Sequence, residues 1–209
     1  MKRRRFLHAL LAVPLLGFVR PESLLPRRAS FEEVGNSVLM TVSLPTLFGR
    51  YDRDALDSID SGFDTTLNFT VKLWEHGTRR LIDARELLVR IRRDPWKRRY
   101  VVSTRESGVW RKRTFTERDD AIAAAVKLDR VRVAAVNQLE RGENGHSYFV
   151  EILALRNPLD PPEDFAGSTR AQGRDLEWFG RLVDVLAGER AEAEETVHVK
   201  TNPFYLVER

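Results

Sequence analysis

The stretch Thr65-Thr66-Leu67-Asn68-Phe69-Thr70-Val71-Lys72-Leu73-Trp74 decides the fold of this chain. From Leu67 to Leu73 every second residue is apolar, and the residues between them are polar. A period of two indicates a β-strand that buries one face and leaves the other polar. Such strands are typical of antiparallel sheets covered on one side, so the stretch favours a mainly antiparallel protein.

The segments around this strand predict further strands joined by turns. Alternating apolar residues predict a strand over residues 36–44, and a short helix is expected over 54–59. Residues 87–92 and 100–104 form a predicted hairpin around Asp94-Pro95-Trp96-Lys97, because proline presets φ at the second position of a turn. Later strands are expected over 131–135, 148–155 and 196–200.

Two further helices complete the predicted architecture. Thr116-Glu117-Arg118-Asp119 resembles a capping box with aspartate in place of glutamate, and it opens an alanine-rich helix that runs to about Leu128. After a loop over residues 163–174, helical spacing predicts an amphipathic helix over 176–186. The predicted class is α+β, mainly antiparallel β, with a twisted sheet or β-sandwich and two or three covering helices.

The order of these elements resembles a family of exported bacterial proteins described only as a domain of unknown function, number forty-three ninety. The resemblance covers about residues 36–156 and departs from the family pattern after Pro158. It implies a similar fold and a location in the cell envelope, and it offers no catalytic residue to carry over. Besides the strands over 36–44 and 65–74, it is carried by Ala55-Leu56-Asp57-Ser58-Ile59-Asp60-Ser61-Gly62, by Trp96-Lys97-Arg98-Arg99-Tyr100-Val101-Val102 and by Thr114-Phe115-Thr116-Glu117-Arg118-Asp119-Asp120-Ala121-Ile122.

The N-terminus carries a basic head followed by a short apolar run. Lys2-Arg3-Arg4-Arg5 precedes an apolar segment that reaches Val19, which is typical of an export signal. The order Arg3-Arg4-Arg5-Phe6-Leu7 resembles the twin-arginine motif of the route that exports folded proteins. The apolar run is short for a spanning helix, but residues 17–30 offer no good cleavage site, so a membrane tether stays open.

These features predict an exported chain of one domain. We expect an export signal or membrane anchor over residues 1–19, a linker over 20–34 and a single globular domain over 35–209. The expected location is the periplasm, with the chain either free or tethered to the membrane and facing the periplasm. The lack of cysteine excludes disulfides, thiolate metal sites and a lipid-modified cysteine anchor.

The net charge of +4 does not describe the folded domain. Residues 1–28 hold seven Lys/Arg and one acid, so they carry +6 and leave −2 for residues 29–209. Global charge is therefore no argument for nucleic-acid binding, and no nucleic-acid partner is expected.

A local basic stretch is the strongest candidate for a binding surface. Between Arg79 and Arg113 there are 13 Lys/Arg against four acids, with three large aromatic residues interleaved. Arginine binds phosphate and carboxylate with two parallel hydrogen bonds, and aromatic faces add stacking. A solvated sheet face is the alternative, since edge charges also block aggregation. The candidate binding residues are Arg90, Arg92, Arg93, Trp96, Arg98, Arg99, Trp110 and Arg111.

No other pattern points to chemistry. His76, His146 and His198 lack the spacing of metal ligands, there is no glycine-rich phosphate loop, and the adjacent acid pairs point apart on a helix. We therefore expect no catalytic residue, no metal and no cofactor. The leading hypothesis is a non-enzymatic envelope domain that binds a protein partner or an anionic lipid or cell-wall surface through the basic hairpin. The alternative is a small-molecule or lipid carrier whose cavity would be lined by Leu67, Phe69, Val71, Leu87 and Val89.

Overall fold

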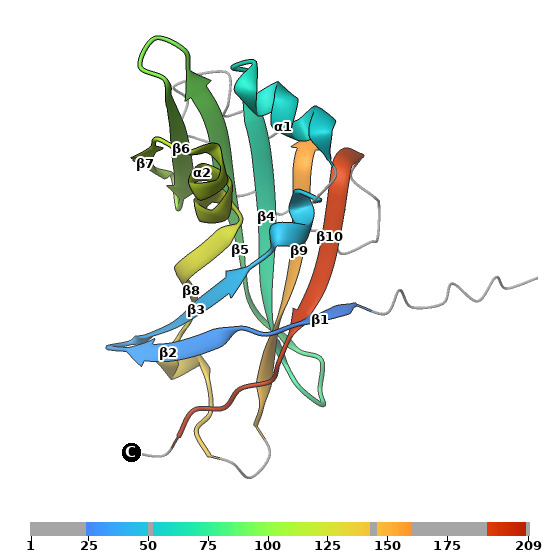
Figure 1. The fold of residues 1–209 in the computed structure, drawn as a ribbon. Coiled ribbons are helices and arrows are strands. Elements are labelled where there is room, and N and C mark those ends of the chain that lie inside the picture. Colours follow the sequence, from blue (N-terminus) through green and yellow to red (C-terminus); the bar gives the residue numbers. More distant parts are fainter. Residues whose placement is uncertain (1–23, 50–51, 143–145, 160–191, 208–209) are drawn as a thin grey trace, which may run out of the picture.

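Two β-sheets form the body of the protein (Figure 1). The computed structural model describes residues 24–49, 52–142, 146–159 and 192–207. The larger sheet has the order β1 (Leu25–Arg27), β10 (Ala193–Thr201), β9 (Tyr148–Pro158), β4 (Thr65–Glu75), β5 (Leu81–Asp94), β6 (Arg99–Glu106) and β7 (Val109–Phe115). The smaller sheet has the order β2 (Ser30–Val34), β3 (Ser37–Ser43) and β8 (Lys127–Ala135).

Every strand pair in both sheets is antiparallel except β1 with β10. The predicted α+β class with a mainly antiparallel, twisted sheet is therefore confirmed. Strand β4 lies near the middle of the larger sheet and buries Leu67, Phe69 and Leu73 at 1% exposure or less. These side chains join one core with residues of the smaller sheet such as Val38 and Val131. The period of two in the opening stretch thus marks the face that packs between the sheets.

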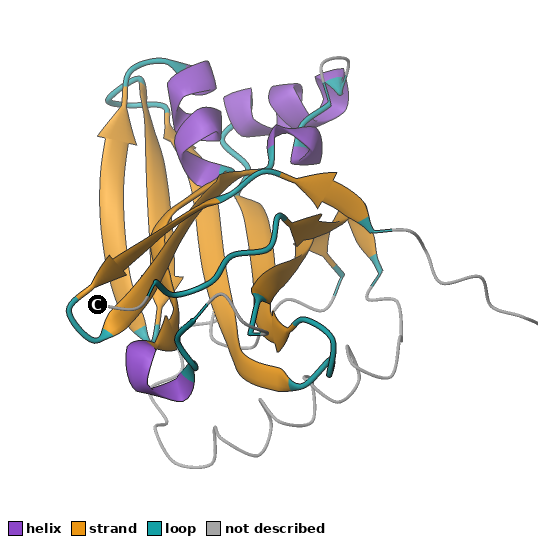
Figure 2. Ribbon diagram, turned by 90° about the horizontal axis from the view of Figure 1, so that it is seen from below, coloured by secondary structure: helices purple, strands orange, loops and turns teal. Residues whose placement is uncertain are grey.

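The two α-helices among the described residues lie on the same side of the strands (Figure 2). Helix α1 (Arg53–Asp60) begins at Asp52, whose Oδ1 accepts a hydrogen bond from the Ala55 amide at 3.2 Å. Helix α2 (Arg118–Ala125) begins at Glu117, which makes no side-chain cap, so the predicted capping box is wrong. Helix α2 also ends before Leu128, because the chain already enters β8 at Lys127. Short 3-10 helices, η1 (Pro45–Leu47) and η2 (Val136–Gln138), follow β3 and β8.

The strands expected over 36–44, 65–74, 131–135, 148–155 and 196–200 are present as β3, β4, β8, β9 and β10. The expected hairpin is β5 with β6. The linker expected over 20–34 is wrong where the structure describes it, because residues 25–27 and 30–34 form β1 and β2. Strand β1 pairs with the edge of β10, a long-range contact that the local composition does not reveal.

Several predictions fall outside the described residues. They are the export signal or anchor over 1–19, the loop over 163–174 and the helix over 176–186. Within the described ranges, no helix has the length and apolar character that crossing a bilayer demands.

Candidate functional site

The turn between β5 and β6 is held in a defined shape. Asp94 pairs with Arg99 in the register, so residues 95–98 form the connection. The Asp94 Oδ1 accepts hydrogen bonds from the backbone amides of Trp96 at 3.0 Å and Lys97 at 3.1 Å. Arg98 adopts a left-handed backbone with φ of 48°. Aspartate side chains commonly accept hydrogen bonds from turn amides in this way, so local contacts alone can order this loop.

This turn presents an aromatic side chain surrounded by cations. Trp96 is 94% exposed, the most exposed large apolar residue among those described. Lys97, Arg98 and Arg99 are also exposed, and the described part of the chain gives their side chains no ion pair or hydrogen bond. Exposure of a tryptophan side chain does not stabilise the fold, because burial of the same side chain would be more favourable.

The loop after α1 adds a second exposed aromatic residue at the same end of the sheet. Phe63 is 69% exposed. The loop is fixed beside β5, because Arg93 Nη1 donates to the Asp60 carbonyl at 2.6 Å and Asp64 forms ion pairs with β5. We call Phe63, Trp96, Lys97, Arg98 and Arg99 the hairpin tip. Sequence reasoning missed Phe63, since only tertiary contacts bring it there.

The remaining predicted site residues divide between the two faces of the sheet. Arg90 and Arg92 share one face, as expected, and both lie against Asp64 at 3.4 and 3.5 Å. The register places Arg99 on that face too. Arg93 lies on the opposite face, with its guanidinium 6.0 Å from the centre of the Tyr100 ring. Arg92 and Arg93 therefore serve partly to position the loop that carries Phe63.

Trp110 and Arg111 lie away from the tip. They belong to β7, where they pair with Arg105 and Thr104 in the register. Five or six residues of β6 separate these positions from Arg99, which corresponds to roughly 15–20 Å. The eight predicted residues therefore do not form one site. The tip gathers Trp96, Arg98 and Arg99, and β7 carries a second basic segment.

A polar hub supports the tip from inside. The Asp60 carboxylate accepts hydrogen bonds from the Tyr100 hydroxyl and from Arg118 Nη1, both at 2.7 Å. Burial and the adjacent Asp60 charge raise the pKa of Tyr100, so the phenol stays a donor. The hub joins α1, β6 and α2, which holds the end of the sheet together.

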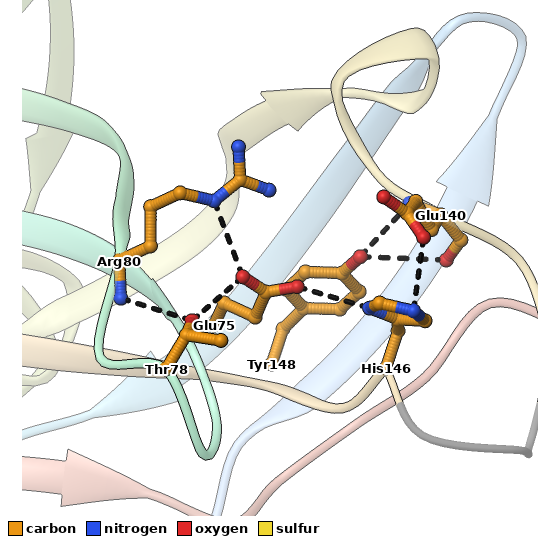
Figure 3. A network of polar contacts seen from close by, with 6 residues as sticks. All are labelled: Glu75, Thr78, Arg80, Glu140, His146 and Tyr148. Carbon is orange, nitrogen blue, oxygen red and sulfur yellow. Dashed lines mark hydrogen bonds and ion pairs between the residues drawn. The ribbon is translucent and has the colours of Figure 1, made fainter.

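The opposite end of β5 holds a second network (Figure 3). Glu75, at the end of β4, is 4% exposed. One carboxylate oxygen accepts from Thr78 Oγ1 at 2.7 Å and from Arg80 Nε at 3.2 Å. The other lies 3.0 Å from His146 Nδ1. These partners lower the pKa of Glu75 to about 2, the hydrogen bond from Thr78 contributing most.

His146 links this carboxylate to a second one. Its Nε2 lies 2.9 Å from Glu140, whose backbone amide donates to the Tyr148 hydroxyl at 2.8 Å (Figure 3). A carboxylate with a lowered pKa stays charged near neutrality, so Glu75 remains a hydrogen-bond acceptor for these partners. The network ties the β4–β5 turn to the segment before β9. Sequence reasoning treated His146 as isolated, because 71 residues separate it from Glu75.

A third cluster lies on the face of the larger sheet opposite the core. Lys72 and Glu151 are register partners on β4 and β9, and His198 Nε2 lies 2.6 Å from the Glu151 carboxylate. Burial lowers the pKa of Lys72. Burial opposes the charge on Glu151 most strongly, but the interactions with His198, Lys72 and Trp74 together outweigh it and lower the pKa of Glu151. The charges in this row compensate one another, as paired groups in a sheet do.

Metal ligation finds no support in the described ranges, where no three His, Cys, Asp or Glu side chains converge on a common point.

A known protein family matches more than half of the chain. A family model described as a domain of unknown function, DUF4390, matches residues 27–157. The chain belongs to the DUF4390 family. The match includes β2 to β9 with the hairpin tip and the Glu75 network, and it ends before β10. No curated protein and no solved structure matches the chain. The DUF4390 assignment confirms the family expected from sequence and brings no activity with it.

Proposed function

We propose that this DUF4390 protein is an exported, non-enzymatic binding domain that docks on an anionic membrane surface through the hairpin tip. The observation that carries the proposal is the 94% exposure of Trp96 beside three cations that no described acid neutralises. Tryptophan favours the boundary between lipid headgroups and acyl chains, and cations beside it favour anionic headgroups.

The energetics agree with reversible docking. A basic residue near an anionic bilayer contributes about 1 kcal/mol, so Lys97, Arg98 and Arg99 together supply on the order of 3 kcal/mol. Phe63 and Trp96 add apolar area that leaves water on insertion. The hydrogen bonds of Asp94 to the turn reduce the loss of backbone freedom on binding, since the tip is already ordered.

An envelope location is consistent with this proposal. The basic head and apolar run of residues 2–19 predict export, which would bring the domain close to a membrane surface. A protein partner at the tip is the competing outcome, because acidic protein surfaces offer the same charge.

The carrier hypothesis gains no support from the described residues. Its five expected lining residues are 0–3% exposed and belong to the common core. They pack between the two sheets, where apolar side chains of β3 and β8 meet them.

Vesicles test the proposal. The full chain is mixed with vesicles of phosphatidylglycerol and phosphatidylethanolamine, or of phosphatidylcholine alone, that contain brominated acyl chains. Quenching of Trp96 emission, taken as the difference from Trp96→Phe, reports insertion of the tip. We expect quenching on the anionic vesicles only, and Arg98→Glu/Arg99→Glu should weaken it by about tenfold or more.

The matched control is Arg111→Glu/Lys112→Glu, which makes the same change in charge on β7. At 0.15 M salt the Debye length is about 8 Å, so this distant change should alter quenching by less than about threefold. Equal losses in both double variants, or no quenching of Trp96 at all, would show that the tip is not a membrane anchor.

A further inference from the structure

The two edges of the larger sheet differ in how well they are protected. The edge strand β1 has three residues and contains Pro26, both of which discourage pairing with another chain. The edge strand β7 has seven residues, contains no proline, and pairs with β6 without a register shift. A long, regular edge leaves alternate backbone N–H and C=O groups pointing away from the sheet.

The side chains of β7 define which strand could pair with it. Six of its seven residues are exposed. Arg111 and Lys112 have no ion pair within the described ranges, and they project to opposite faces of the sheet. Val109, which is 60% exposed, stands at the start of the strand. A basic edge repels a second copy of itself and attracts an extended segment with acidic residues on both faces.

Contacts with helix α2 hold this edge strand in place. Arg113 Nη2 donates to the Ala124 carbonyl of α2 at 3.2 Å, and its guanidinium lies 5.8 Å from the centre of the Phe115 ring. Helix α2 thus holds the end of β7 against β6 on the core side. The backbone edge on the far side of β7 meets no other strand among the described residues.

We propose that β7 is a docking edge for an acidic, extended segment of a partner protein, which adds an eighth strand to the larger sheet. Backbone hydrogen bonds would supply affinity, and carboxylates opposite Arg111 and Lys112 would supply selectivity. This surface is separate from the hairpin tip, so the inference does not depend on membrane docking.

A synthetic peptide tests the edge directly. The probe is the blocked peptide Val-Thr-Glu-Glu-Thr-Val-Thr, whose adjacent glutamates project to opposite faces of a strand. Its control carries the same side chains with alternate backbone amides methylated. We expect the full chain to bind the probe at least about tenfold more tightly than the methylated control, because methylation removes strand pairing and keeps the charge. Backbone amides of β7 should also become protected from hydrogen exchange when the probe binds.

Protein variants separate this site from the tip. Arg111→Glu/Lys112→Glu should weaken probe binding by about tenfold or more, and Arg98→Glu/Arg99→Glu should leave it within about twofold. Equal binding of the two peptides would reduce the interaction to nonspecific charge and overturn the proposal. Equal sensitivity to the two double variants would overturn it as well. Loss of vesicle docking with intact peptide binding would reject the tip alone.

Discussion

Strand β5 begins and ends in turns of opposite character. At its first residue, Leu81, the preceding turn holds Glu75 as a buried carboxylate with partners on both oxygens. At its last residue, Asp94, the following turn leaves Trp96 and three cations in water. Both turns contain arginine, so the amino-acid type alone does not tell the two apart. What differs is whether a distant segment supplies a partner.

The two turns differ in whether their charges stabilise the fold or stay solvated. Buried charges need partners, because an unpaired charge that is removed from water strongly destabilises the folded state. The Glu75 end meets this demand through His146 and Arg80, and we assign it to stability. The charges of the hairpin tip are solvated and carry no desolvation penalty, so they remain available to a ligand. Substitutions should therefore reduce stability at the first end and binding at the second.

The largest loss of stability is expected for Glu75→Gln. The amide keeps the shape of the side chain but loses the charge that Thr78, Arg80 and His146 engage. We expect the melting temperature to fall by roughly 5 °C at pH 7, as measured by circular dichroism. Glu140→Gln is the control, because Glu140 is 63% exposed and should matter far less. Equal shifts for both variants would contradict the central place of Glu75.

The same site predicts how stability depends on acid. The folded pKa of Glu75, about 2, lies below its ordinary value of 4.5. Its contribution is therefore complete above about pH 4.5 and is lost as the pH falls towards 2. Denaturant unfolding of the wild type and of Glu75→Gln should differ most near pH 5–7, and the difference should shrink towards pH 2. A constant difference across this range would show that Glu75 does not titrate in this way.

An intermediate effect is expected at the hub behind the tip. Tyr100→Phe removes the hydroxyl that donates to Asp60 at 2.7 Å, and a typical hydrogen bond of a partly exposed pair contributes about 0.5–1.5 kcal/mol. The free energy of unfolding should fall by about that amount in urea titrations. Vesicle docking should weaken only slightly, because the hydrogen bonds of Asp94 that shape the turn are intact. A loss of docking as large as that of the tip reversal would mean that the hub controls the tip.

The smallest change in stability is expected for Trp96→Ala. Its side chain is 94% exposed and contributes little to the folded state, so the free energy of unfolding should change by less than about 0.5 kcal/mol. Docking on anionic vesicles, measured by sedimentation, should nonetheless weaken. A clear destabilisation would show that Trp96 packs against the domain, and the contrast between the two turns would fail.

Much of the fold could be predicted from local patterns in the sequence. Strand β4 and the β5–β6 turn were predictable, because period-two alternation and the order Asp94-Pro95 act over a few residues. Strand β7 was not, since the run Arg111-Lys112-Arg113 breaks the alternation and the strand forms by pairing with β6. Helix α2 was expected with a capping box that Glu117 does not make.

The candidate site was predictable only in part, for the same physical reason. Trp96, Arg98 and Arg99 stand together because one short turn holds them. Phe63 joins them through contacts of Asp60 and Asp64 with β5, and His146 reaches Glu75 across 71 residues. Contacts of this range depend on the complete sheet order, which no local pattern encodes.

The parallel pairing of β1 with β10 fixes where the N-terminal segment joins the domain. Leu25 pairs with Val199, six residues along β10 from Ala193, so β1 joins the half of β10 that lies away from the hairpin tip. If the export signal stays uncut and the hairpin tip docks on lipid as proposed, the domain has two attachments to the membrane at separate places. Two weak attachments on one body reinforce each other, since the second forms at a high effective concentration. Cleavage of the signal should therefore raise the rate of dissociation from vesicles.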